Sequence, residues 1–317
     1  MYPSPGFFLS KIFSGILLLV FVHILPVKAQ DNSLRFFDFP GKYNSKRFKT
    51  VIAVESGLYA ASMIELNELW YKNYERSPFH FFNDNEEWLQ MDKAGHAVSA
   101  YYLGKVGVDA LRWSGVGEKK AIFFGGSLGS VFLTTIEILD GFSNQWGFSK
   151  GDVLANTFGS LVFIGQELGW KEQRILLKFS FSGSRYAQYR PDLLGNSVPE
   201  RVLKDYNGQT YWVSANISSF LKQENKFPKW LNIAFGYGAD GMLGGGINPL
   251  FNDKGISYPS FERYRQYYFS LDVDLTRIKT SSKLLNACFH TFGFIKFPAP
   301  ALEYNEVEGL KFLPFYF

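Results

Sequence analysis

The chain has 317 residues, with 33 Lys+Arg against 29 Asp+Glu, four His, one Cys and an aromatic share of 18%. This length suits one large domain or two smaller ones. A formal charge of +4 is too small to predict nucleic-acid binding. The single cysteine, Cys288, excludes a disulfide framework and a Cys-based zinc or iron–sulfur site. The aromatic excess favours an apolar surface or a membrane interface.

The first 29 residues have the pattern of a secretory signal peptide. Lys11 precedes an apolar run over 12–25, and a small-x-small sequence ends at Ala29. This run is short for a membrane span, although a retained N-terminal anchor is the alternative. No cysteine follows the predicted cleavage point, so lipid attachment to an N-terminal cysteine is not expected. We predict an exported protein of the periplasm or outer membrane of a Gram-negative bacterium.

Residues 30–172 are predicted to form a helical domain, because their apolar residues recur with the helical period. Ser149 is a good N-cap for the last helix, and Gly125 and Gly129 give one helix a face that a neighbour can approach closely. The two most apolar helices fit either a soluble bundle or partial contact with lipid. The four expected helices are 47–74, 92–113, 119–139 and 151–169.

Residues 173–317 are predicted to form a β-rich domain, because the apolar period changes to two. In the clearest strand, Tyr267, Phe269 and Leu271 alternate with Ser270 and Asp272. The expected fold class is therefore α+β, a bundle of about four helices followed by an antiparallel sheet or partial barrel of about six strands. The expected strands are 174–182, 210–218, 230–238, 264–278, 294–304 and 310–317.

A sheet with one apolar and one polar face has two readings. It suits a membrane, with the apolar face toward lipid, or a soluble antiparallel sheet that packs on helices. The aromatic residues Phe315 and Phe317 resemble the C-terminal signal of outer-membrane β-proteins. Pro298, Pro300 and Pro314 fit edge positions better than a continuous barrel, and six strands are fewer than a small bacterial barrel has. Both readings stay open.

Candidate chemistry lies in the helical domain, in three groups of polar side chains near predicted helix ends. One pair is spaced i,i+4 on one helix face, so that a carboxylate could orient an imidazole and raise its basicity. A second pair places two acids at a helix C-terminus, where the helix dipole disfavours them. A third pair is embedded in an apolar helix, where burial is costly without partners. The groups are Asp92 with His96, Glu137 with Asp140, and Asp152 with Asn156.

In an up-and-down bundle these helix ends meet on one side, so the side chains are expected to converge. Three roles fit such a cluster. It is a structural polar network that fixes helix register, a divalent cation site, or an acid/base site that uses His96 as base. The candidate cation ligands are Asp92, His96, Glu137, Asp140 and Asp152, and the candidate acid/base residues are these five with Asn156. No organic cofactor is expected.

These motifs together resemble a known family. The sequence Asp92-Lys93-x-x-His96, followed by Glu137-x-x-Asp140 and by Gly147-Phe148-Ser149-x-x-Asp152, is similar to the YfiM-like envelope lipoproteins over about 88–170. A fainter similarity connects it to the VanZ-like membrane proteins. The resemblance implies a small helical envelope domain of unknown function. This chain departs from the family because it lacks the lipoprotein cysteine and adds a long β-rich half.

Three functional hypotheses follow. The first is a non-enzymatic envelope protein with a structural or interaction role, held at the outer membrane by its β-rich half. The second is a membrane-associated enzyme that acts on lipid or glycan head groups through the His/carboxylate cluster. The third is a periplasmic module that binds an apolar ligand. The expected partners are membrane or envelope components and not nucleic acid.

Overall fold

The computed structural model describes residues 40–69, 71, 75–222, 224, 226–252 and 254–317, so the predicted signal peptide lies outside the described residues. The chain forms two compact units. The helical unit contains residues 40–84 and 96–173, and the sheet unit contains residues 85–95 and 174–317.

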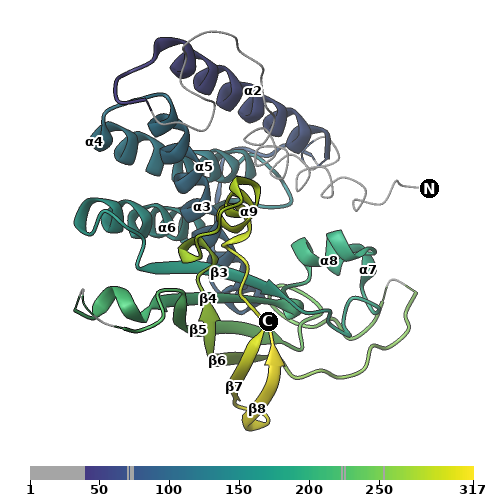
Figure 1. Cartoon of the computed structure of the whole chain (residues 1–317). Coiled ribbons are helices and arrows are strands. Elements are labelled where there is room, and N and C mark those ends of the chain that lie inside the picture. Colours follow the sequence, from purple (N-terminus) through teal and green to yellow (C-terminus); the bar gives the residue numbers. More distant parts are fainter. Residues whose placement is uncertain (1–39, 70, 72–74, 223, 225, 253) are drawn as a thin grey trace. The chain divides into compact units, whose positions relative to one another are not determined.

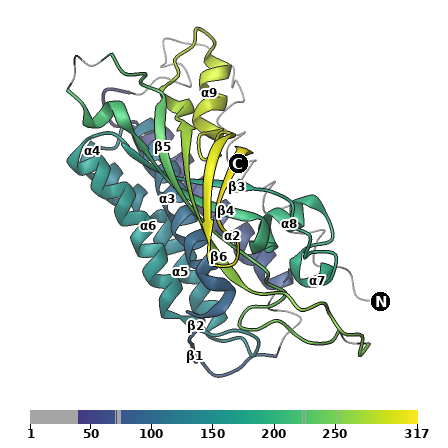
Figure 2. The same ribbon diagram turned by 90° about the horizontal axis from the view of Figure 1, so that it is seen from below.

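The helical unit is built from helices that match the predicted apolar periodicity (Figure 1). Its long elements are α2 (Ser45–Leu69), α3 (Met91–Trp113), α5 (Leu128–Asp140) and α6 (Lys150–Gly169). A short helix α4 (Glu118–Lys120) and a π-helical turn η3 (Ala121–Gly125) precede α5. Two short parallel strands, β1 (Phe81–Phe82) and β2 (Phe148–Ser149), join the loop before α3 to the start of α6. Figure 2 shows α5 and α6 alongside each other.

Small residues allow α3 to pack closely against its neighbours. A Cβ atom built on Gly129 would lie 2.3 Å from the carbonyl oxygen of Ala100, and one on Gly125 would lie 2.7 Å from that of Gly107. A Cβ on Gly159 of α6 would lie only 2.0 Å from the Ala97 oxygen. The expectation that glycine leaves a helix face open to a neighbour is confirmed, and the bare faces bring three helices into backbone contact.

This packing gives a direct test of the helical unit. We expect Gly159→Ala to destabilise it by about 1–3 kcal/mol, because the added methyl group must push α3 and α6 apart. Gly165→Ala on the same helix is the matched control, since a Cβ there meets nothing within 4 Å. It should be neutral or slightly stabilising. Thermal melting followed by circular dichroism at 222 nm compares them, and equal Tm values would contradict the close-packing argument.

The outward side of the helical unit is apolar. Leu154, Phe158, Leu161 and Leu168 repeat along α6 at helical spacing, and each is more than half exposed. Among the described residues, one helical stretch, 118–140, is long and apolar enough to cross a membrane by length and composition, and a third of its best window is buried. This criterion alone is weak evidence, since core helices of soluble proteins also meet it.

The sheet unit contains one antiparallel sheet in which every strand pairs with the next in sequence (Figure 1). The strands are β3 (Ile175–Phe181), β4 (Gln209–Asn216), β5 (Leu231–Asp240), β6 (Tyr264–Val273), β7 (Ala299–Asn305) and β8 (Gly309–Tyr316). The helices between them are α7 (Pro191–Leu194), α8 (Val198–Lys204) and α9 (Lys283–Phe292). All six predicted strands are therefore present. The predicted total of about four helices is too low, because the loops of the sheet unit contain further short helices.

The free edge of β3 is covered by the segment that leads into β7. Phe179 forms a parallel bridge with Ile295, the Phe179 N–H donates to Phe294 O at 2.8 Å, and the Lys296 N–H donates to Phe179 O at 2.9 Å. Tyr316 of β8 also reaches Thr210 of β4, with 2.9 Å between the hydroxyl oxygens. These contacts join β3 and β4 to segments near the other end of the sheet order, so the six-stranded antiparallel sheet is curled.

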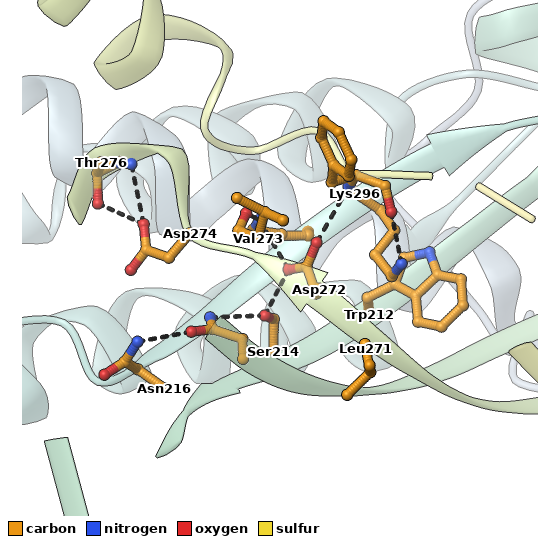
Figure 3. A network of polar contacts seen from close by, with 12 residues as sticks. Trp212, Ser214, Asn216, Leu271, Asp272, Val273, Asp274, Thr276 and Lys296 are labelled. Carbon is orange, nitrogen blue, oxygen red and sulfur yellow. Dashed lines mark hydrogen bonds and ion pairs between the residues drawn. The ribbon is translucent and has the colours of Figure 1, made fainter. Parts of the chain in front are cut away.

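The inner face of this curled sheet is polar. Lys178, Asp272 and Lys296 are buried, with an Nζ–Oδ2 distance of 2.7 Å between Lys178 and Asp272. Figure 3 shows Asp272 and Lys296 in this network. The Ser214 hydroxyl donates to the same Asp272 oxygen at 2.6 Å, and Asn232 donates to Ser214 at 2.9 Å. A buried network of charges and amides therefore lies on this face beside an aromatic cluster of Trp212, Tyr268 and Tyr316.

The outer face carries the apolar side chains instead. Val213, Phe235, Phe269 and Leu271 are 43–56% exposed on β4, β5 and β6. The face continues over β7 and β8 with Leu302, Tyr304, Leu310, Phe312 and Phe315. The predicted alternation in 264–273 is thus present with a definite direction, in which the polar residues point inward and the apolar residues outward.

Candidate functional site

The predicted cluster centres on His96, in the second turn of α3. Its ring nitrogen Nδ1 lies 2.9 Å from Oδ1 of Asn156 on α6. The other ring nitrogen, Nε2, lies 3.8 Å from Oε1 of Glu137 on α5 and 3.8 Å from Oδ1 of Asp152 on α6. Three helices therefore bring one imidazole, two carboxylates and one amide together within the helical unit.

The start of α6 organises the carboxylates. Ser149 caps the helix, since its hydroxyl oxygen accepts from the Asp152 N–H at 3.1 Å, which confirms the predicted N-cap. The Ser149 N–H donates to Glu137 Oε2 at 3.4 Å, and its hydroxyl donates to Asp84 Oδ1 at 2.7 Å. The β1–β2 pairing places Phe82 opposite Ser149, which brings the loop that contains Asp84 to this helix end. Ser149 thus contacts the side chains of Glu137 and Asp84 and the backbone N–H of Asp152.

Burial and mutual repulsion shift the acids of this cluster. Desolvation, followed by the charges of Asp152 and Asp140, raises the pKa of Glu137 to about 9. Desolvation also raises the pKa of Asp140 to about 6, although the Tyr71 hydroxyl, which donates to Asp140 Oδ1 at 2.7 Å, acts in the opposite direction. Glu137 is therefore a neutral acid at pH 7 in the protein without a bound cation, and the cluster keeps a proton that a positive charge can displace.

Four of the six predicted site residues come together around His96, and the other two, Asp140 and Asp92, have other partners. Figure 1 locates α3, α5 and α6, which bring His96, Glu137, Asp152 and Asn156 into contact. Asp140 binds Tyr71 at the end of α5. Asp92 belongs to the sheet unit and forms an ion pair with Lys93, with 2.8 Å between Oδ2 and Nζ. Asp92 was expected to orient the imidazole of His96, whereas the structure places Asn156 Oδ1 at 2.9 Å from Nδ1 of that ring.

Three contributors to the site were not predicted from the sequence. They are Asp84, Tyr71 and the hydrogen bond that the Ser149 N–H donates to Glu137. Asp84 lies in a loop whose position depends on a two-residue parallel bridge, a pairing that leaves almost no periodic signal. Tyr71 follows α2 and reaches Asp140 across the unit. Only the N-cap spacing of Ser149 and Asp152 was available from the sequence.

Two kinds of chemistry fit this arrangement. Two carboxylates and an imidazole nitrogen offer donor atoms for a divalent cation, and the pKa of Glu137, raised to about 9, favours a protonated carboxyl group that could act as an acid. The same contacts also hold α3, α5 and α6 in register. His96 is 24% exposed while Glu137 and Asp152 are nearly covered, so the imidazole forms the accessible side of the cluster.

Comparison with known families finds one similarity. Residues 80–164 match a family described as a predicted periplasmic lipoprotein, DUF2279, a domain of unknown function. The match includes the whole His96 cluster and none of β3–β8. It confirms the prediction of an exported protein of the periplasm or outer membrane. The YfiM-like name and the VanZ-like similarity stay predictions. No curated protein and no solved structure matches the chain.

Proposed function

We propose that this chain is an exported envelope protein with a structural or interaction role, and that it docks on the periplasmic leaflet of the outer membrane through its sheet. The observation that carries the proposal is that the apolar face of the sheet is the exposed, outer one. Buried charged and amide side chains lie on the inner face together with an aromatic cluster, while large apolar side chains cover the outer face. Water is a poor environment for such an outer face, and acyl chains are a good one.

The composition of the outer face supports lipid as the contacting phase. Phe235 and Phe269 form a cross-strand pair with ring centroids 5.1 Å apart, and Tyr237 and Tyr267 form another at 5.8 Å. Phenylalanine prefers the apolar region of a bilayer, whereas tyrosine prefers the level of the head groups. Neighbouring Phe and Tyr pairs therefore suit a surface that lies at the boundary between them.

The length of the strands favours docking over spanning. A strand that crosses a bilayer needs about 9–11 residues at a strong tilt. Strands β3 and β7 have 7 residues, and β4 and β8 have 8. Only β5 and β6, with 10 residues each, reach that length among the described strands. The sheet therefore suits partial insertion into one leaflet.

The interior of the sheet disfavours the third hypothesis, an apolar ligand held inside it. Trp212 is 1% exposed and packs against Tyr268 and Tyr316, with ring centroids 5.6 and 6.1 Å away. Lys178 and Asp272 occupy the neighbouring inward positions. An apolar ligand that entered this space would have to displace these three aromatic side chains and an ion pair.

Fractionation tests the docking proposal. We expect the protein to sediment with outer membranes and to stay there in high salt, because the contact is apolar. The double variant Phe269→Ser, Phe312→Ser should move most of the protein to the soluble fraction, since it removes two exposed rings from the outer face. Immunoblotting of the membrane and soluble fractions measures the distribution.

The matched control is the double variant Ile247→Ser, Leu250→Ser. These side chains are 82% and 74% exposed but lie in the loop after β5, away from the strands. The control should stay with the membrane. A soluble wild-type protein, or equal release of both double variants, would rule out lipid docking by the outer face.

A further inference from the structure

We propose that His96 Nε2, Glu137 and Asp152 form a binding site for a divalent transition-metal ion. The inference concerns the helical unit alone and does not depend on membrane docking. One donor atom from each residue, an imidazole nitrogen or a carboxylate oxygen, lies within 4.8 Å of the other two. The three donors come from three different helices, α3, α5 and α6.

The distances suit a shared ion better than a direct bond. At 3.8 Å, His96 Nε2 is too far from either carboxylate for a hydrogen bond. Two ligands that each lie about 2.1 Å from a common ion are separated by at most about 4.2 Å. An ion can therefore lie between Nε2 and both carboxylates after small side-chain movements, with the helix backbones in place.

The surroundings of His96 prepare Nε2 as a ligand. The Nδ1–H of a neutral imidazole can donate to Asn156 Oδ1 at 2.9 Å, which leaves the lone pair on Nε2, the atom that faces the carboxylates. Metal-binding histidines usually make such a hydrogen bond with their other nitrogen. Asn156 is therefore a positioning residue for His96, and the sequence spacing of four residues from Asp152 puts both side chains on one face of α6.

Asn156 supplies an independent sign that the cluster is built for a ligand. Its side chain is fully buried, and its Nδ2 atom has no hydrogen-bond partner among the described residues. A buried amide donor without a partner is costly, and a polar group bound in the cluster would satisfy it.

The donor set indicates the class of metal. An imidazole nitrogen favours transition metals over Mg²⁺ and Ca²⁺, whereas the two carboxylates make the site harder than a cysteine or multi-histidine zinc site. Mn²⁺ and Zn²⁺ both fit this mixture. The partly exposed edge of His96 gives the ion a route to the buried carboxylates, since its side chain is 24% exposed against 4% for Glu137. Three protein ligands leave further coordination positions for water.

Titration with Mn²⁺ tests the site. The full chain, treated with EDTA and then desalted, should bind one Mn²⁺ per chain, measured as loss of the free-ion signal in electron paramagnetic resonance. Asp152→Asn and Glu137→Gln should each weaken binding at least tenfold, because each removes one anionic ligand. Asn156→Ala should weaken it about tenfold, the usual effect of losing such a support. Asp109→Asn is the matched control, a surface acid paired with Lys105 on α3, and should leave binding unchanged.

A second measurement does not depend on whether the cluster variants fold. Electron spin echo modulation of bound Mn²⁺ should detect a histidine nitrogen in the wild-type protein and in a His23→Gln, His80→Gln, His290→Gln variant, in which His96 is the one histidine left. Absence of binding at millimolar Mn²⁺, absence of nitrogen coupling in that variant, or unchanged affinity in folded Asp152→Asn and Glu137→Gln would each overturn the proposal.

Discussion

Replacing Asp272 with asparagine should destabilise the sheet unit by about 3–5 kcal/mol, the typical cost of removing one partner from a buried ion pair. The Lys178 and Asp272 side chains are both 0% exposed, and their charged atoms are 2.7 Å apart. Asparagine keeps the shape but has a single acceptor oxygen, so it can still accept from only one of two donors, the Ser214 hydroxyl or the Phe297 N–H. It cannot balance the ammonium groups of Lys178 and Lys296, which are both buried.

Thermal melting followed by tryptophan fluorescence, on protein extracted in a mild detergent, measures this loss. Asp274→Asn is the matched control because Asp274 is equally buried but pairs with Arg277, whose side chain is 20% exposed and keeps access to water. We expect a much smaller change in Tm for the control. The double variant Lys178→Met, Asp272→Asn should recover part of the lost stability. Equal Tm values for Asp272→Asn and Asp274→Asn would show that breaking the buried Lys178–Asp272 pair costs no more stability than breaking the partly exposed Arg277–Asp274 pair.

Raising the pH from about 8 to about 10.5 should stabilise the wild-type sheet unit relative to Lys296→Met. Desolvation lowers the pKa of Lys296 to about 8, Asp272 partly opposes this, and the Lys178 charge adds to it. A lysine whose pKa is depressed in the folded state binds its proton more tightly when unfolded. Its unfavourable contribution is therefore largest below pH 8 and disappears as the pH rises through this window, by no more than about 3 kcal/mol.

Methionine is a suitable replacement because it keeps the length of the side chain and its contact with Trp212, over which the Lys296 ammonium lies at 4.9 Å. Other lysines and tyrosines titrate in the same window, so the difference in Tm between the two proteins is the quantity to follow. We expect this difference to shift in favour of the wild type between pH 7.5 and 10.5. A constant difference over that range would show that Lys296 keeps an ordinary pKa.

The secondary structure could be predicted well because the two halves have different periods. The helix expected over 151–169 is α6, Lys150–Gly169, and the strand expected over 174–182 is β3, Ile175–Phe181. Such segments bury one face, and burial fixes where apolar residues recur. The short helices α7, α8 and α9 were not predicted, because a helix of one to three turns inside a loop has too few repeats to show a period.

Which face of the sheet points inward could not be predicted without knowledge of the tertiary structure. The alternation in β6 predicted two faces, but Tyr268, Ser270 and Asp272 can point inward only because β3 meets residues 294–296 and the sheet curls. A flat sheet with the same sequence would bury Phe269 and Leu271 against a second layer. Pattern alone does not distinguish these two arrangements.

The candidate site shows the same division. Helix spacing predicted that Asp152 and Asn156 share a face, and helix order predicted that they meet His96 and Glu137. Asp92 is four residues from His96, as Asp152 is from Asn156, yet Asp92 forms an ion pair with Lys93. The sequence could not rank an in-helix partner against an amide from another helix, because that choice depends on how α3 and α6 pack through Gly159.

The bridge between Phe179 and Ile295 has a consequence for the order in which the protein matures. A polypeptide that is exported with its N-terminus first delivers β3 early, whereas the segment that covers its edge arrives near the end of translocation. Until then β3 offers unpaired backbone groups, and the inward lysines lack the enclosure of the finished sheet. Unpaired edges of this kind promote aggregation. Truncation after β6 should therefore yield insoluble, protease-sensitive material even though four strands have been made.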